Sequence, residues 1–450
     1  MRKQVDLCNG PIFKGVIRYT LPIILTNVLQ LLYNAADIIV VGRFCGSTPI
    51  AAVGASASVV HLLVGLFIGL SAGAGATIAH AIGAKDSDGV KKAVHTSLAV
   101  GLVGGVILTI VGVALSEPIL RLLKTPEDVL PLAVLYMQIF FSGMIPNVFC
   151  FFAGAVINAT GETQKPLKFL SFSGILNVIL NVFFVTVFDM SVDGVALASI
   201  LAQTCSALLF AKELVSRNDS CKLYLKEIRF HKKPLIKILA IGIPSGIQGC
   251  LFSFANTFVQ SSVNAFGTAA VAGNSAAANI EGFVYTAMNS FSQTALVFTG
   301  QNLGAGKPQR IKQAMLTTAA CAGALGLVLG ASMFLFAKPL LSIYITDSAE
   351  AIVYGLQRMT LIGLLYFPCG IMECISATNR ALGRATASMV ICVFFVCVFR
   401  ILWINSAFLL PTLHNFYGLF ACFPISWIMC IGVQLPLFIF TFRKLKRKTL

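Results

Sequence analysis

The sequence predicts an all-α membrane protein with twelve transmembrane helices in two six-helix bundles, related by a pseudo-two-fold axis along the membrane normal. Hydrophobic residues make up 57% of the 450 residues and charged residues only 11%, whereas a soluble domain carries roughly 25% charged residues. Solidly apolar runs of about 20 residues or longer recur, and each could cross roughly 30 Å of hydrocarbon as a helix. In addition, the pattern of residues 11–166 reappears about 222 positions later.

Prolines define this internal repeat. Four of them recur in register: Pro11 as Pro234, Pro22 as Pro244, Pro118 as Pro339, and Pro146 as Pro368. An even number of spans in each half makes both halves enter the membrane from the same side, which is the pattern of parallel repeats in transporters. We expect Pro22 and Pro244 to be the points at which their helices bend.

The apolar runs divide the chain into six spans per half. Those of the first half are expected at 15–41, 50–80, 91–116, 129–158, 165–188 and 193–216, and those of the second half at 234–264, 269–302, 311–337, 350–380, 386–409 and 416–441. We therefore expect an N-lobe over 1–216, a cytoplasmic linker over 217–233 and a C-lobe over 234–450.

The distribution of basic residues supports this order of spans and sets their orientation. Of the 33 Lys and Arg residues, 27 fall in segments assigned to one side of the membrane. These segments are the N-terminus up to Arg18, 85–92, 165–168, 212–237, 307–312, 380–384 and 443–448. The positive-inside rule then predicts a multi-pass plasma-membrane protein with both termini in the cytoplasm. The net charge of +16 thus reflects topology, and no basic soluble face for nucleic acid is present.

Asp37 is the first of three acidic residues that fall deep within predicted spans. It shares a helix face with Asn34, three residues earlier. In the second half Asn256 occupies the place of Asn34, but Val259 occupies that of Asp37. A carboxylate at this depth is costly and usually faces a cavity, so we expect a functional role for Asp37.

Polar residues on the fifth and sixth spans could complete a site around this carboxylate. Asn177 and Asn181 lie one turn apart on the fifth span, and Ser199 lies on the sixth. Their oxygen atoms could join Asp37 around Na⁺, or hydrogen-bond a protonated Asp37. The alternative is that these residues only hold neighbouring membrane helices together.

The second half holds the other deep acids, Glu281 and Glu373. Glu281 lies at nearly the repeat position of His61, and the hypothesis is that the two face one another or a shared cavity. Glu373 precedes Arg380 by two helical turns, so a structural ion pair and a transport role are both open. Two further arginines, Arg358 and Arg400, lie near outer span ends, where we expect them to snorkel towards water.

These residues give the chain a resemblance to the MATE family of multidrug and toxic-compound extrusion antiporters, along nearly its whole length. The resemblance rests on Leu21-Pro22, Tyr33-Asn34, Asp37-Ile38-Ile39-Val40-Val41-Gly42, Gly300-Gln301-Asn302-Leu303-Gly304-Ala305-Gly306 and Arg380-Ala381-Leu382-Gly383. It implies two six-helix lobes around a central cavity. It also implies efflux of amphipathic, often cationic compounds in exchange for H⁺ or Na⁺.

The resemblance also assigns residues. The family's N-lobe cation site maps onto Asp37, Asn177 and Ser199. The chain departs from the pattern at Asn181, where many prokaryotic members carry a second acid, and at Phe252, near the place of an acid in the NorM-like branch. The chain is therefore nearer the DinF-like branch, with Asp37 as the only titrating group of the N-lobe site.

The expected function is a secondary active antiporter that exports amphipathic, cationic drugs or metabolites, with H⁺ or Na⁺ as the coupling ion. Asn34, Asn256, His61, Glu281 and Glu373 are the candidate cavity residues. We expect a monomer in contact with membrane lipid, without a cofactor and with no metal other than Na⁺ at Asp37. A flippase for lipid-linked precursors, of the related MurJ-like group, is the main alternative. An intramembrane enzyme is not expected, because no paired catalytic set accompanies the deep acids.

Overall fold

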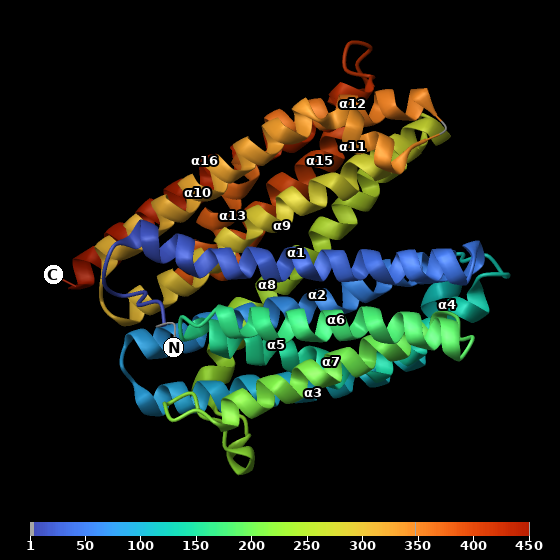
Figure 1. Cartoon of the computed structure of the whole chain (residues 1–450). Helices are drawn as coiled ribbons and strands as arrows, with labels where there is room; N and C mark the ends of the chain where they lie inside the picture. The colour runs from blue at the N-terminus through green and yellow to red at the C-terminus, as the bar shows by residue number, and fades with distance from the viewer. Residues whose placement is uncertain (1–3, 347, 450) are drawn as a thin grey trace. The chain divides into compact units, whose positions relative to one another are not determined.

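The computed structural model describes residues 4–346 and 348–449, apart from the side chains of Ser47, Ser58, His61, Lys448 and Thr449. Helices cover all twelve predicted ranges in this part of the chain (Figure 1). The first half contains α1 (Ile12–Phe44), α2 (Ser47–Gly83), α3 (Ser87–Leu122), α4 (Leu130–Ser142), α5 (Met144–Ala159), α6 (Gln164–Val187) and α7 (Val192–Val215). The second contains α8 (Lys232–Asn264), α9 (Thr268–Gly304), α10 (Pro308–Leu335), α11 (Ala337–Tyr344), α12 (Ala349–Leu364), α13 (Phe367–Asn379), α14 (Ala385–Cys392), α15 (Phe399–Ile404) and α16 (Phe416–Thr449).

Two spans predicted as continuous helices are broken, and the repeated prolines explain both breaks. The range 129–158 consists of α4 and α5, which meet at an angle of 51° beside Gly143. The range 350–380 consists of α12 and α13. Pro146 and Pro368 lie in the first turns of α5 and α13, where a missing N–H prevents a bond to the preceding helix. The internal repeat therefore extends to the position of these breaks.

The helices differ in hydropathy because some carry more polar side chains than others. Within the described residues, nine helices are long and apolar enough to cross a membrane, or ten if α4 and α5 form one span. α9 is not among them, although it is 37 residues long. Asn274, Asn279, Glu281 and Asn289 interrupt its apolar sequence. A polar membrane helix of this kind is expected to face protein or a cavity rather than lipid.

The helices form two compact units, but the boundary does not fall in the predicted linker. Unit 1 comprises the residues up to Val5 and Leu21–Gly246, and unit 2 comprises Asp6–Thr20 and Ile247–Leu450. The linker 217–233 thus lies within unit 1, together with the first half of α8. The chain changes unit first between Val5 and Asp6, before α1. The other two changes occur inside a helix, next to Pro22 in α1 and next to Pro244 in α8.

Glycines explain why the first half of α8 belongs to unit 1. A Cβ atom built on Gly69 of α2 would lie 2.2 Å from the backbone nitrogen of Gly246, and one on Gly73 would lie 2.5 Å from the carbonyl oxygen of Ile238. A Cβ on Gly242 would likewise lie 2.6 Å from the Cα atom of Leu70. The two helices therefore pack backbone to backbone, which only small residues permit.

This contact predicts a strong effect of a single side chain. Gly69→Val should prevent α2 and α8 from packing, because the clashing atom belongs to the backbone and cannot rotate away. Overpacking of this kind costs about 1–3 kcal/mol, and more where backbone must move. The thermal midpoint of the purified protein and the yield of monodisperse protein in size-exclusion chromatography measure it. Gly54→Val is the matched control in the same helix, because nothing lies within 4 Å of its added Cβ. Equal midpoints for the two variants would contradict the packing argument.

The first half of α1 belongs to unit 2 through contacts with α9. The hydroxyl groups of Thr20 and Thr294 lie 2.8 Å apart, and the rings of Tyr19 and Phe298 meet edge to face at 5.6 Å. The preceding segment is held by side chains at the far end of α9 and the start of α10. Three side chains donate hydrogen bonds to backbone carbonyls of this segment. Asn302 donates to Leu7, Lys307 to Cys8 and Arg310 to Gly10, each over 3.0 Å. The chain therefore enters α1 with its backbone carbonyls already satisfied by unit 2.

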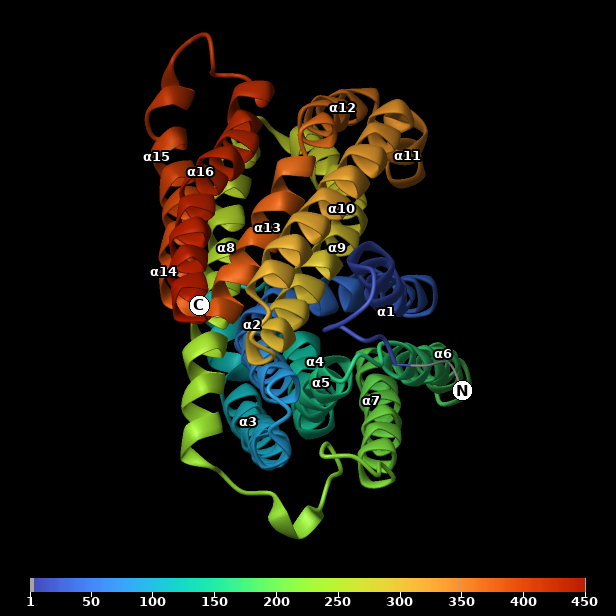
Figure 2. The same ribbon diagram turned by 90° about the vertical axis from the view of Figure 1, so that its left-hand side faces the viewer.

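The linker between α7 and α8 is the light-green segment at the bottom of Figure 2. It is fixed to unit 1 by Arg217, whose side chain is nearly buried. Its guanidinium group lies 2.5 Å from Asp219 and 3.0 Å from Glu162. Burial raises the pKa of Asp219, but the hydrogen bonds and charge of Arg217 outweigh it and hold that pKa below its ordinary value. The linker is thus a structured part of unit 1 and not a flexible tether.

Candidate functional sites

Asp37 lies in a polar cluster that spans α1, α6 and α7 of unit 1. The side-chain amide of Asn181 donates a hydrogen bond to Oδ1 of Asp37 and another, of 3.3 Å, to Oδ1 of Asn177. Asn177 donates in turn to the hydroxyl of Ser199 over 3.2 Å. The four residues that the sequence singled out for a cation site are therefore in one hydrogen-bonded chain.

The two asparagines in the middle of this hydrogen-bonded chain are its most buried members. Asn181 is fully buried and Asn177 nearly so, whereas Asp37 and Ser199 are partly exposed. The carbonyl oxygen of Asn181 accepts no hydrogen bond from any described residue. A buried amide oxygen without a donor costs free energy unless something else satisfies it. Together with a carboxylate and a hydroxyl, it supplies the hard oxygen ligands that a small cation prefers.

Asn34, the other candidate on the outer part of α1, lies outside this chain of bonds. It is exposed, and its side-chain oxygen accepts a bond from Gln30 over 3.5 Å. The neighbouring Tyr33 instead points towards α6, where its hydroxyl donates to the carbonyl of Ser171 over 3.2 Å. His61, a further cavity candidate on α2, has a side chain outside the described residues.

Unit 2 contains a partly open cavity of about 440 Å³ between α8, α9, α12, α13, α15 and α16. Its lining includes three predicted cavity residues and both of the arginines that were expected to reach towards water: Asn256, Glu281, Glu373, Arg358 and Arg400. Both acids and Arg400 are nearly fully buried, while Asn256 is exposed. The cavity thus concentrates charge at a depth where charge is rare.

Glu281 is paired with Arg358, which corrects the expectation that Arg358 snorkels. Arg358 donates to both carboxylate oxygens, over 2.8 Å and 2.6 Å, and its third nitrogen donates to Asn274 over 2.5 Å. The pairing with His61 suggested by the repeat is therefore not needed to neutralise Glu281. Arg358 does not snorkel, because a carboxylate in the neighbouring helix satisfies its guanidinium group more fully than a distant interface could.

Glu373 is the isolated acid of the cavity. It is 4% exposed, and it makes no hydrogen bond or ion pair with any residue that the structure describes. The sequence left an ion pair with Arg380 open. The charge of Arg380 does act on the Glu373 carboxyl, but the two make no direct salt bridge among the described residues. Two helical turns span about 11 Å along the axis, and the helix changes to π-helical geometry over Arg380–Arg384. Of the two roles that the sequence left open, the structural pair is the one that the geometry disfavours.

Arg400 was expected to snorkel, but it is 3% exposed and lies inside unit 2. Its Nε donates to the hydroxyl of Ser426 over 3.2 Å, and Nη1 donates to the side-chain oxygen of Asn256 over 3.4 Å. The guanidinium carbon lies 3.8 Å from the ring centre of Phe423 and 5.9 Å from that of Trp427. Sequence reasoning named this residue but missed its inward direction, because a position near a helix end is compatible with either direction.

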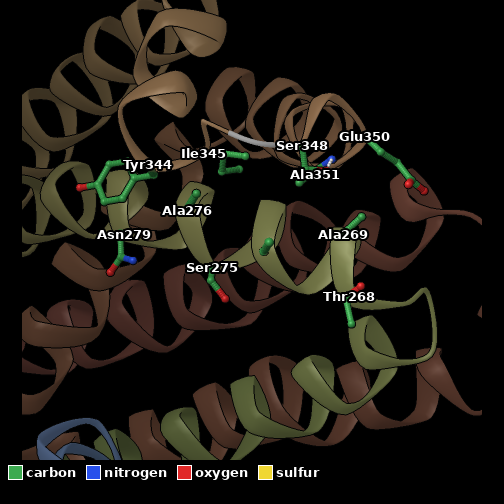
Figure 3. A pocket seen from close by; sticks show the side chains of 11 residues that line it. Thr268, Ala269, Ser275, Ala276, Asn279, Tyr344, Ile345, Ser348, Glu350 and Ala351 are labelled. Atoms are coloured by element: carbon green, nitrogen blue, oxygen red, sulfur yellow. Dashed lines mark hydrogen bonds between the residues drawn. The ribbon is translucent and has the colours of Figure 1, made fainter. Parts of the chain in front are cut away.

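A second hollow in unit 2, of about 570 Å³, has a different character. It is an open cleft between the start of α9 and the segment from α11 to α12 (Figure 3). Mostly small or uncharged side chains line it, such as Thr268, Ser275 and Asn279, and Glu350 is the one acid among its lining residues. Without opposed charges or buried polar groups it is the weaker candidate for a binding site.

Known proteins resemble this chain in both sequence and fold. The sequence model of the MatE family matches residues 22–183 and 244–404, which are the two repeats. The probable multidrug resistance protein YoeA of Bacillus subtilis is 28% identical over 86% of this chain and 84% of its own length. The multidrug export protein MepA of Staphylococcus aureus is 23% identical over 95% and 92%.

Among solved structures, the outward-facing conformation of a multidrug resistance MATE family transporter superposes with a TM-score of 0.91. It is 23% identical, and the match covers 99% of both chains. This likeness confirms the predicted all-α membrane fold, and the two family matches coincide with the internal repeat. The chain belongs to the MATE family, whose members are multi-pass membrane transporters and not enzymes.

Proposed function

We propose that this protein is an antiporter that exports amphipathic, cationic drugs or metabolites from the cytoplasm in exchange for H⁺ or Na⁺. The plasma membrane is its location, with both termini on the cytoplasmic side, and the monomer is the working unit. The observation that carries the proposal is the hydrogen-bonded chain of Asp37, Asn181, Asn177 and Ser199. A carboxylate whose neighbours are all uncharged can change its own charge without opposing another ion.

The coupling ion binds at Asp37 in this proposal. As a carboxylate, Asp37 accepts the bond from Asn181 and attracts a cation. A proton removes its charge directly, whereas Na⁺ would use the oxygens of Asn177, Asn181 and Ser199 as further ligands. In both cases the same side chain would serve the ion and a cationic substrate in turn, which makes the two bind in competition.

The prolines of α1 and α8 are the proposed bending points. Pro22 and Pro244 each remove one helical hydrogen bond, and each lies where its helix passes from one compact unit to the other. Because Asp37 lies further along α1, a change in its hydrogen bonds can alter the helix that joins the units. Cation binding and substrate release would then be linked through a single helix.

Transport by purified protein in liposomes tests the proposal. A fluorescent cationic dye should move when a pH gradient is imposed without sodium, or when a sodium gradient is imposed at equal pH. The gradient that drives the dye identifies the coupling ion. Movement of labelled lipid without dye movement would instead support the flippase alternative. Dye movement that neither gradient affects would refute coupled exchange.

A further inference from the structure

Arg400 is a buried cation with no acidic partner among the residues that the structure describes. Its contacts are a hydroxyl, an amide oxygen and two aromatic rings, all of which are neutral. Its Nη2 donates to no described group, although Arg400 lines the 440 Å³ cavity of unit 2. An arginine buried without a counter-ion is costly in a membrane protein, and such residues usually mark a binding pathway.

Arg358, in the same cavity, is an example of an arginine with a structural role and serves as a comparison for Arg400. It forms a fork with both oxygens of Glu281 and a further bond to Asn274. Arg400 is more deeply buried than Arg358 but has an incomplete set of partners. Ser426 and Asn256 fix its orientation from two sides, and the Phe423 ring supports its plane. A guanidinium group held in this way presents its remaining donors to an incoming oxyanion.

We propose that Arg400 forms an anion subsite, and that the unit 2 cavity accepts amphipathic aromatic compounds that carry a carboxylate or a phosphate monoester. The oxyanion would accept hydrogen bonds from Nη2 and from the remaining N–H of Nη1. The aromatic part of the ligand would pack beside Trp427 and Tyr366, whose stacked rings lie 5.4 Å apart and line the same cavity. A ligand that also carries a positive group would place that group beside Glu373, the unpaired acid of the cavity.

This inference extends the proposed function from purely cationic substrates to zwitterionic and anionic ones, and it rests on that function only in treating the cavity as a substrate site. It does not depend on Asp37 or on an ion gradient. Binding to the detergent-purified full chain can therefore test it separately from transport.

The chain provides its own reporter for this test, because it has only two tryptophans and Trp427 lines the cavity. Trp403→Phe leaves Trp427 as the sole tryptophan, and its fluorescence is followed during titration. The probes are para-butylbenzoate, para-butylphenyl phosphate and the neutral isostere para-butylbenzamide. We expect at least one anionic probe to bind about tenfold or more tightly than the amide, because a charge-assisted bond is lost in the latter. Comparison of the two anions shows which oxyanion the subsite prefers.

Substitution of Arg400 in this background decides the assignment. Arg400→Gln should remove the preference for anions over the amide, and Arg400→Lys should restore part of it. Arg443→Gln, at the exposed end of α16, is the matched control and should keep the preference. The proposal is overturned if the anions and the amide bind equally, or if Arg400→Gln retains the preference. A lower thermal midpoint with an unchanged preference would identify Arg400 as a purely structural residue. Loss of dye transport with the anion preference intact would count against the proposed function alone.

Discussion

Replacing Asp37 with asparagine should abolish ion-coupled transport and leave a folded protein in the membrane. Asparagine has nearly the same shape, and its side-chain oxygen can still accept the bond that Asn181 donates. What it loses is the charge that attracts a cation and the ability to take up a proton. We therefore expect gradient-driven dye transport in liposomes to fall to the level of empty vesicles, with little change in the thermal midpoint.

The matched control for this variant removes an acid whose charge is already exposed. Glu117→Gln takes away a carboxylate on α3 that is 51% exposed and paired with Arg121, and such a pair contributes about 0–1 kcal/mol. It should transport the dye normally. Near-normal coupled transport by Asp37→Asn would show that another group carries the ion, and a loss of folded protein would show a structural role instead.

Removing Arg358 should have the largest effect on stability of any charge change in unit 2. Arg358→Met would leave the Glu281 carboxylate 4% exposed and without its counter-ion. Breaking a buried ion pair from one side typically costs about 3–5 kcal/mol, because the remaining charge stays desolvated. Denaturant unfolding in mixed micelles, followed by far-ultraviolet circular dichroism, measures this loss as a lower midpoint.

A double substitution distinguishes the interaction energy of the Arg358–Glu281 pair from the separate contributions of the two residues. Glu281→Gln in the Arg358→Met background removes the stranded charge and should recover most of the lost stability, so that the two effects are strongly non-additive. Arg121→Met, which breaks an exposed pair with Glu117, should change the midpoint little. Additive losses in the double variant would mean that Arg358 and Glu281 stabilise the unit through separate contacts.

The polar cluster of unit 1 could be anticipated, whereas the charge pairing of unit 2 could not. A lone carboxylate deep in an apolar span needs donors, and Asn177 and Asn181 were the amides that shared one face of another span. In unit 2 there were two acids and several arginines, so each acid had more than one plausible partner. The direction of a long arginine side chain depends on its neighbours in space, and the neighbours of Arg358 and Arg400 lie on helices distant in sequence.

The helix breaks follow from prolines that the sequence contains, but the sequence analysis predicted continuous spans there. Pro146 and Pro368 recur at the same place in each repeat, and each lies in the first turn of a helix that follows a break. The proline rule is local, since it concerns one missing donor. By contrast, the assignment of the first half of α8 to unit 1 depends on Gly69 and Gly73 meeting Gly242 and Gly246 at backbone distance. Nothing local in either segment specifies that meeting.

The amino-acid sequence by itself determined the membrane class, the helical ranges, the two repeats and the acids that lie at depth, because these follow from local hydropathy and from the cost of burying charge. Tertiary structure alone decided which charges neutralise each other, which buried arginine lacks an acidic partner among the described residues, and where the compact units divide. Those features depend on contacts between helices far apart in sequence, where a side chain meets its partner only after the helices have packed.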